Sequence, residues 1–331
     1  MTLSRGAIGN LVNRYRAVLR KCRMMNVFGS LAVAGMLVAG NAGFAGAEEL
    51  SGDISPISLS GDTRNIIGVG DISLRSTEPA LRYLINVSGQ GQLDISMSNG
   101  SPMAVGNADG IYLKDYSEYD QYASAFHVAG SGSSGSFVGT GTFSMVGGGK
   151  LLGVCAFLSE SKGTLTLSGD ITGEAEAVMN GSNGYASFAA AAAGGNLVFG
   201  GDRTTLRAKA STGNNANGAF VKYGGMIDFA SKSVLIESKN TDSNSVGINC
   251  ADGTVKTSAD TDLDIVVEGN KATTGIQLTA SSSDVQLAGN LDLTATQTGQ
   301  DSFASVLGIS NDSGKMVVSG PTSLRLVTNA P

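Results

Sequence analysis

A repeat of about 30 residues in the second half of the chain limits its possible folds more than any other feature. From about Gly181 onward, short stretches of alternating apolar and polar residues come in groups of three, separated by Gly, Ser, Asn and Asp. Corresponding apolar residues of successive groups lie 28 to 33 positions apart. They are Phe188, Phe220, Ile248, Ile276 and Val306 in the first stretch; Leu197, Ile227, Val255, Val285 and Val317 in the second; and Leu206, Ile236, Ile265, Leu293 and Leu326 in the third. A repeat of this length built from strands alone predicts stacked coils.

The alternation within each stretch predicts which side chains face the core. In residues 262–269 it places Leu263, Ile265 and Val267 inside and the intervening acidic residues outside. One coil cannot bury its apolar side chains alone, so each strand should pair in parallel with its counterpart about 4.8 Å away. We therefore predict an all-β protein, a parallel β-helix (β-solenoid) with about 30 residues per three-strand coil. The 47 glycines are expected at its corners.

Upstream of the clear repeat the same pattern continues with poorer register. Residues 124–177 contain two further expected coils, so we assign 124–331 to the β-helix. Residues 48–123 also alternate but align with no coil, and we expect an N-terminal cap or an irregular β region there. The run Ala189 to Ala193 is expected to be a tight or looped stretch of small residues with no chemical role.

The first 47 residues are typical of an export signal. Six basic residues and no acidic one precede an apolar segment from Val27 to Ala39, whose length suits a helical signal peptide better than a transmembrane helix. Ala45 and Ala47 provide the small residues that signal peptidase requires, so we expect cleavage after Ala47. The alternative is an uncleaved anchor running from Val27 to Ala47. The expected partners are the Sec export machinery and signal peptidase.

Two features together resemble a known family. Asn13 to Lys21 read NRYRAVLRK, which is similar to the extended signal peptide region of type V secretion autotransporters of Gram-negative bacteria. The repeat resembles the right-handed parallel β-helix passenger of the same family. The family's carboxy-terminal translocator barrel has no counterpart before Pro331, so we expect a truncated passenger. The resemblance implies the cell surface or the extracellular space, or the periplasm if the translocator is absent.

The net negative charge of the mature chain excludes polyanionic partners. Residues 1–47 carry six of the 22 Lys and Arg, so their removal leaves 16 against 28 Asp and Glu, a net charge of −12. Nucleic acid and other polyanions should be repelled. The mature chain has only Cys155 and Cys250, which we expect to be buried structural thiols, although the sequence leaves open whether they pair.

The sequence contains no strong motif for catalysis or for metal binding. His127 is the only histidine and is expected to be an ordinary strand residue, and no serine protease motif is present. Asp260, Asp262 and Asp264 share a strand face but fail the calcium-loop pattern, so we predict no metal and no cofactor. Outward acidic residues such as Asp228, Asp264 and Asp292 show no basic companion or aromatic platform, and we predict that the chain is not an enzyme.

The best binding candidate is a tyrosine-rich acidic segment, YLKDYSEYDQY. It holds four of the eight tyrosines, namely Tyr112, Tyr116, Tyr119 and Tyr122. Their rings could contact a sugar or a protein partner, or could pack on the solenoid. We therefore expect a passenger that acts by contact, in adhesion, aggregation or biofilm, on a host or bacterial surface protein or glycan. The alternatives are a polysaccharide-active β-helix enzyme and a non-functional truncated passenger.

Overall fold

A computed structural model describes residues 47–78, 81–98, 100–107, 122–147, 153–178, 186–211, 215–299 and 305–328. The expected helical signal peptide, with Ala45, and the three tyrosines Tyr112, Tyr116 and Tyr119 lie outside these residues. Within the described ranges, no helix is long and apolar enough to cross a membrane. Residues 48–331 form a compact unit with its own core.

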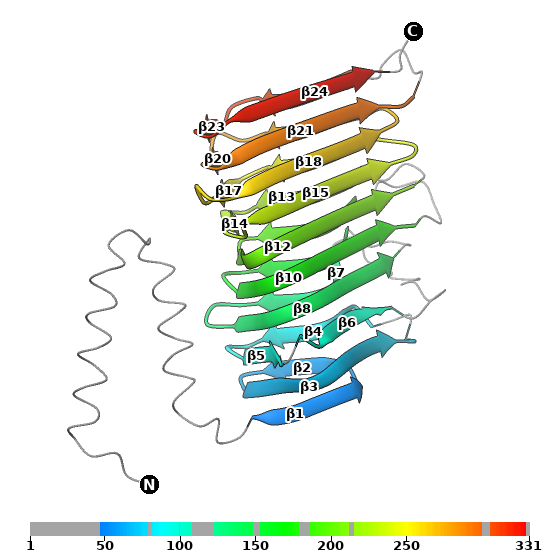
Figure 1. The fold of residues 1–331 in the computed structure, drawn as a ribbon, viewed down its shortest axis with the longest axis vertical. Coiled ribbons are helices and arrows are strands. Elements are labelled where there is room, and N and C mark those ends of the chain that lie inside the picture. The colour runs from blue at the N-terminus through cyan, green and yellow to red at the C-terminus, as the bar shows by residue number, and fades with distance from the viewer. Residues whose placement is uncertain are drawn as a thin grey trace, which may run out of the picture. The chain divides into compact units, whose positions relative to one another are not determined.

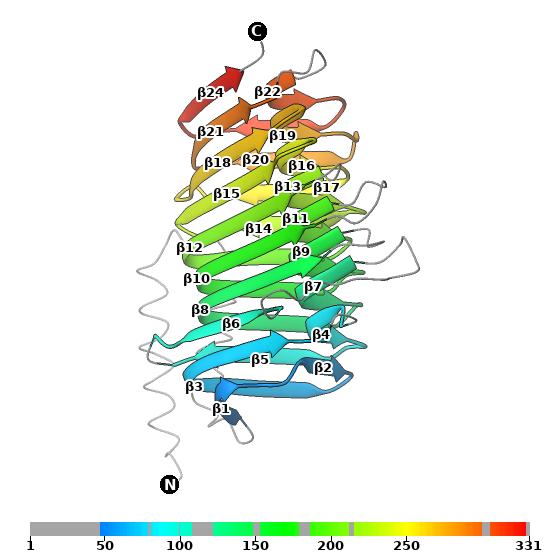
Figure 2. The same ribbon diagram turned by 90° about the vertical axis from the view of Figure 1, so that its right-hand side faces the viewer.

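The described strands stack into two parallel sheets that share one axis (Figures 1 and 2). Sheet B has nine strands: β2 (Ile57–Ser60), β4 (Tyr83–Ser88), β7 (Tyr122–Ala129), β9 (Gly153–Glu160), β11 (Ala186–Ala193), β13 (Asn215–Lys222), β16 (Ser245–Cys250), β19 (Ala272–Leu278) and β22 (Ser305–Asn311).

Sheet A has 15 strands: β1 (Glu48–Asp53), β3 (Thr63–Ser76), β5 (Gln92–Met97), β6 (Pro102–Asn107), β8 (Ser134–Gly147), β10 (Thr164–Ala177), β12 (Asn196–Ala210), β14 (Gly225–Phe229), β15 (Ser233–Asn240), β17 (Gly253–Thr257), β18 (Asp262–Gly269), β20 (Ser283–Leu287), β21 (Asn290–Gln297), β23 (Lys315–Val318) and β24 (Thr322–Thr328).

The predicted parallel β-solenoid is confirmed by the strand register. Ile236 pairs with Ile265, and Ile265 pairs with Leu293, so equivalent residues of successive coils lie side by side. Leu263, Ile265 and Val267 are buried as predicted. Residues 48–107, for which the sequence predicted a cap or an irregular region, contain β1 to β6, and these strands pair in parallel with one another and with β7 and β8. Ala189 to Ala193 lie in strand β11, so the predicted loop there was wrong.

The predicted register is wrong in the last coil. Leu293 pairs with Leu324 instead of Leu326, and Val285 pairs with Met316 instead of Val317. Ile276 likewise pairs with Ile309 and not with Val306. In this coil most apolar side chains are partly exposed. Alternation alone therefore could not distinguish inward from outward positions there.

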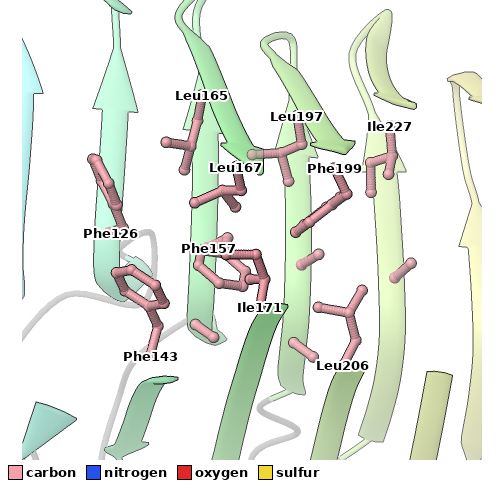
Figure 3. Close-up of a cluster of buried hydrophobic side chains, with 14 of the residues drawn as sticks. Phe126, Phe143, Phe157, Leu165, Leu167, Ile171, Leu197, Phe199, Leu206 and Ile227 are labelled. Carbon is pink, nitrogen blue, oxygen red and sulfur yellow. The ribbon is translucent and has the colours of Figure 1, made fainter. Parts of the chain in front are cut away.

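Aromatic side chains fill the centre of the core between the two sheets (Figure 3). The ring of Phe157 lies 5.1 Å from that of Phe143 and 5.6 Å from that of Phe199, and Phe199 lies 5.4 Å from Phe229. These rings come from successive coils, so each coil buries its aromatic residue against the next.

The outer face of sheet A carries ion pairs that join neighbouring coils. Arg207 on β12 contacts Glu174 of β10 at 3.1 Å and Glu237 of β15 at 2.5 Å. Lys239 on β15 contacts Glu268 of β18 at 2.9 Å. The parallel register places these side chains next to each other, so these charges are paired from one coil to the next along the stack.

We expect Arg207→Met to lower the free energy of unfolding by only about 1 kcal/mol or less, because the pairs are partly exposed to water. The loss should shrink further at about 1 M salt, where screening weakens the wild-type pairs. Urea unfolding of both proteins at low and high salt measures this. A large loss that is insensitive to salt would show that the arginine stabilises the fold by packing instead.

Candidate functional site

The outer face of sheet B differs in charge from that of sheet A. Across the nine described strands of sheet B, Glu160 and Lys222 are the only Asp, Glu, Lys or Arg residues, and each ends its strand. Strands β7, β9 and β11 read YASAFHVA, GVCAFLSE and ASFAAAAA. Near-continuous apolar strands of this kind are typical of sheets buried on both faces. The outer face of sheet B therefore lacks the charged side chains of an ordinary solvated surface.

Aromatic side chains reach this outer face because the alternation of inward and outward residues is interrupted in the strands of sheet B. Ala189 and Ala190 both belong to the main core, although they are adjacent in sequence. The interruption leaves Phe188 outside the core, in a second cluster with Tyr122, Cys155, Leu158 and Ala191. Phe220 packs against this cluster and stacks on Phe188 at 4.7 Å. The predicted correspondence of Phe188 with Phe220 is also wrong, because Phe188 pairs with Asn217 and Phe220 pairs with Ala191.

His127 lies at the centre of a polar network on the same face. Its Nδ1 is 2.8 Å from Asn86 Oδ1, and its Nε2 is 3.0 Å from Glu160 Oε2. The ring of Tyr83 stacks on the imidazole at 4.0 Å. Both ring nitrogens are engaged and the residue is only 5% exposed, so His127 is positioned to hold the network together and not to act as a free general base.

Two cations lie against the aromatic rings of the outer face. Arg82 lies 4.8 Å from the centre of the Tyr83 ring and donates to the Tyr83 hydroxyl. Lys222 Nζ lies 5.2 Å from the centre of the Tyr122 ring and 4.5 Å from that of Tyr223. Such contacts keep the rings in place and cover part of the aromatic surface with positive charge.

Burial raises the pKa of Tyr83 to about 12, against the lowering effect of Arg82. Burial also raises the pKa of Tyr122 and of the Cys155 thiol. Cys155 therefore stays a thiol at neutral pH and is not an activated nucleophile. Cys155 lies in the outer cluster, whereas Cys250 lies in the main core, and both are free. The expectation of buried structural thiols is confirmed.

We expect the free energy of unfolding to fall between about pH 10 and pH 12 because of Tyr83. The native state keeps this hydroxyl protonated up to about pH 12, whereas the unfolded chain loses the proton near pH 10. The stabilisation is thus complete below pH 10 and is lost as the pH rises through 12. Urea unfolding across this range should show a shallower decline in Tyr83→Phe than in the wild type. Identical slopes would contradict the assignment.

A groove continues this face toward the C-terminal coils, from β11 to β19. Its volume is about 290 Å³, and no charged side chain lines it. Phe188 and Phe220 form its aromatic part, while five amide side chains form its polar part, namely Asn215, Asn217, Asn244, Asn249 and Gln277. The parallel pairing of β13, β16 and β19 aligns Phe220, Asn249 and Gln277 in one row across three coils.

One polar atom in the groove lacks a partner. Asn249 Nδ2 donates to Asn217 Oδ1 at 3.1 Å, which orients both amides. Asn249 Oδ1 is buried and accepts no hydrogen bond from the described residues. A buried acceptor without a donor costs about 1–3 kcal/mol, so this oxygen is suited to a ligand that brings a donor.

Asp228, Asp262, Asp264 and Asp292 lie on strands of sheet A, whereas Asp260 lies in the turn before β18 and does not share their strand face as predicted. Asp228 pairs with Lys256 at 2.9 Å, which corrects the expectation that it has no basic companion. Asp264 lies beside Asp292 of the next coil, and both line a hollow of about 610 Å³. Partial burial, Asp292 and Glu237 raise the pKa of Asp264. In the described part of the chain, no group of three or more His, Cys, Asp or Glu side chains is arranged to hold a metal ion.

Two of the predicted site residues, Ala47 and Tyr122, lie in the described part of the chain. Tyr122 belongs to the outer cluster of sheet B and is buried. Ala47 immediately precedes β1, and the other predicted site residues lie outside the described ranges. The His127 network and the amide groove were not predicted from the sequence. The scarcity of charged residues in the sheet B strands was the available signal, but these apolar runs were interpreted only as core.

Comparisons with family models, curated proteins and solved structures give no match for this chain.

Proposed function

We propose that the chain is an exported solenoid of the autotransporter-passenger type, which acts by contact through the outer face of sheet B. Its expected location is the surface or surroundings of a Gram-negative cell, or the periplasm, and its expected roles are adhesion, aggregation or biofilm formation. The basic, acid-free leader and the solenoid repeat support export of this type. The expected partner is a surface protein or a glycan.

The observation that carries this proposal is the unequal distribution of charge. Sheet A has inter-coil ion pairs along its outer face, as an ordinary solvated surface does. Sheet B instead carries aromatic rings, of which Tyr122 and Phe188 are buried, and an uncharged groove lined by the partly exposed Phe220 and by amides. Tyrosine, phenylalanine and amide side chains are typical of surfaces that bind by contact, with broad area and adaptable hydrogen bonds.

Export and contact can be tested separately. In a Gram-negative cell that produces the full chain, the exported protein should begin at Glu48, as N-terminal sequencing would show. Purified residues 48–331, which form a unit with its own core, should then bind bacterial or host cells in a saturable way. Retention of the intact leader in the cytoplasm would overturn the export proposal. Absence of saturable binding to either kind of cell would overturn the contact proposal.

A second candidate function rests on the paired acidic residues of sheet A. Asp264 and Asp292 lie side by side in a hollow, and the raised pKa of Asp264 suits a general acid. This arrangement would fit a polysaccharide-active enzyme. Incubation with neutral and acidic polysaccharides should then release reducing ends, and Asp264→Asn should abolish the release. Absence of release by the wild type would remove this candidate.

A further inference from the structure

We propose that the groove between β11 and β19 binds a neutral glycan chain that lies along the stack of coils. This inference rests on the proposed function and names the chemistry of its partner. It is carried by the uncharged lining of the groove, by the amides in that lining and by the unpartnered oxygen of Asn249.

The groove offers an aromatic platform followed by amides at regular spacing. Phe188 and Phe220 stack at 4.7 Å. From Phe220 the row continues with Asn249 on β16 and Gln277 on β19, one residue per coil. Parallel strands lie about 4.8 Å apart, so the row presents hydrogen-bonding groups at a short, constant repeat. A ligand that matches this arrangement is an extended polymer with a repeating unit.

The amides select hydroxyl groups in particular. Each amide side chain offers two donors and one acceptor, which suits the hydroxyl group because it also donates and accepts. Asn249 Oδ1 is buried and needs a donor, while its Nδ2 is already occupied by Asn217. The partly exposed ring of Phe220, which stacks on the buried Phe188, can stack in turn against the apolar face of a sugar ring. Hydroxyls and apolar ring faces occur together in glycans.

Charge selects neutral glycans over acidic ones. The groove has no charged lining residue, so it has no cation to pair with a carboxylate or sulfate. The mature chain carries a net charge of −12, which repels polyanions at longer range. An extended peptide is disfavoured because such peptides bind at free sheet edges, whereas this groove lies on the face of a sheet.

The test uses purified residues 48–331 with immobilised neutral hexasaccharides of glucose, mannose and galactose, and with uronic acid oligomers as the acidic probes. We expect at least one neutral hexasaccharide to be retained and the acidic oligomers not to be. Asn249→Ala and Phe220→Ala should each weaken binding about tenfold or more. Asn196→Ala is the matched control, because Asn196 is also half-buried and hydrogen-bonded through its side chain, but lies on sheet A.

Gln277→Ala serves as a second groove variant if Asn249→Ala does not fold, as circular dichroism would show. Absence of neutral glycan binding, stronger binding of the acidic oligomers, or full binding by the groove variants would each overturn the inference. Cell binding that the neutral hexasaccharides do not compete away would also overturn it, while leaving the proposed contact function in place. Failure to bind both cells and glycans would overturn both.

Discussion

Gly169→Ala is expected to lower the free energy of unfolding by about 3 kcal/mol or more. Gly169 turns the chain within β10 at a φ of +120°, a conformation that costs a side chain about 1–3 kcal/mol. A Cβ atom there would also overlap the carbonyl oxygen of Gly139 in the neighbouring coil. That oxygen belongs to the backbone of a paired strand, so it cannot move aside without disturbing the register of β8 and β10.

The matched control is Gly224→Ala. Gly224 also has a positive φ, +71°, but a Cβ atom there would meet nothing within 4 Å. Its cost should be limited to the conformational penalty of about 1–2 kcal/mol. Urea unfolding followed by circular dichroism compares the two proteins. Equal losses would show that contact between coils at the Gly139–Gly169 corner is not as tight as described.

Phe199→Ala should cost about 3–5 kcal/mol, the usual cost of removing a buried phenylalanine ring. Its ring is fully buried, 5.6 Å from the ring of Phe157 in one adjacent coil (Figure 3) and 5.4 Å from the ring of Phe229 in the other. Because coils contact only their neighbours, the loss should be local. Hydrogen exchange should become faster in β10, β12 and β14 and change little in β21.

Phe199→Leu is the control for this prediction, because it keeps most of the volume. It should cost less than about 1.5 kcal/mol. A uniform increase in exchange along the whole chain would contradict the expectation that stability is a sum of contacts between neighbouring coils.

The period and the alternation of the sequence were sufficient to predict the solenoid. Strands β18 and β21 bury apolar residues at every second position, as at Leu263 and Ile265, and the parallel register preserves this from one coil to the next. The alternation is interrupted in sheet B. Two consecutive residues of β11, Ala189 and Ala190, face inward, so Phe188 and Phe220 do not occupy corresponding positions although the repeat predicted that they do.

The candidate site was less predictable because it is assembled from residues far apart in sequence. Asn86, His127 and Glu160 come from three coils, and no local motif links them. The row formed by Asn249 and Gln277 likewise depends on strand register, because these two residues become neighbours only when β16 pairs with β19. The tyrosine-rich segment was recognisable from composition, but of its four tyrosines only Tyr122 lies in the described part of the chain.

The most direct test of the claim that the outer face of sheet B makes the contact is a pair of charge substitutions measured by cell binding. Gln277→Glu adds one negative charge to the amide groove, and Gln92→Glu adds the same charge to the exposed outer face of sheet A. We expect Gln277→Glu to weaken binding by about tenfold or more and Gln92→Glu to leave it unchanged. Equal binding by both variants, or a loss confined to Gln92→Glu, would contradict this assignment.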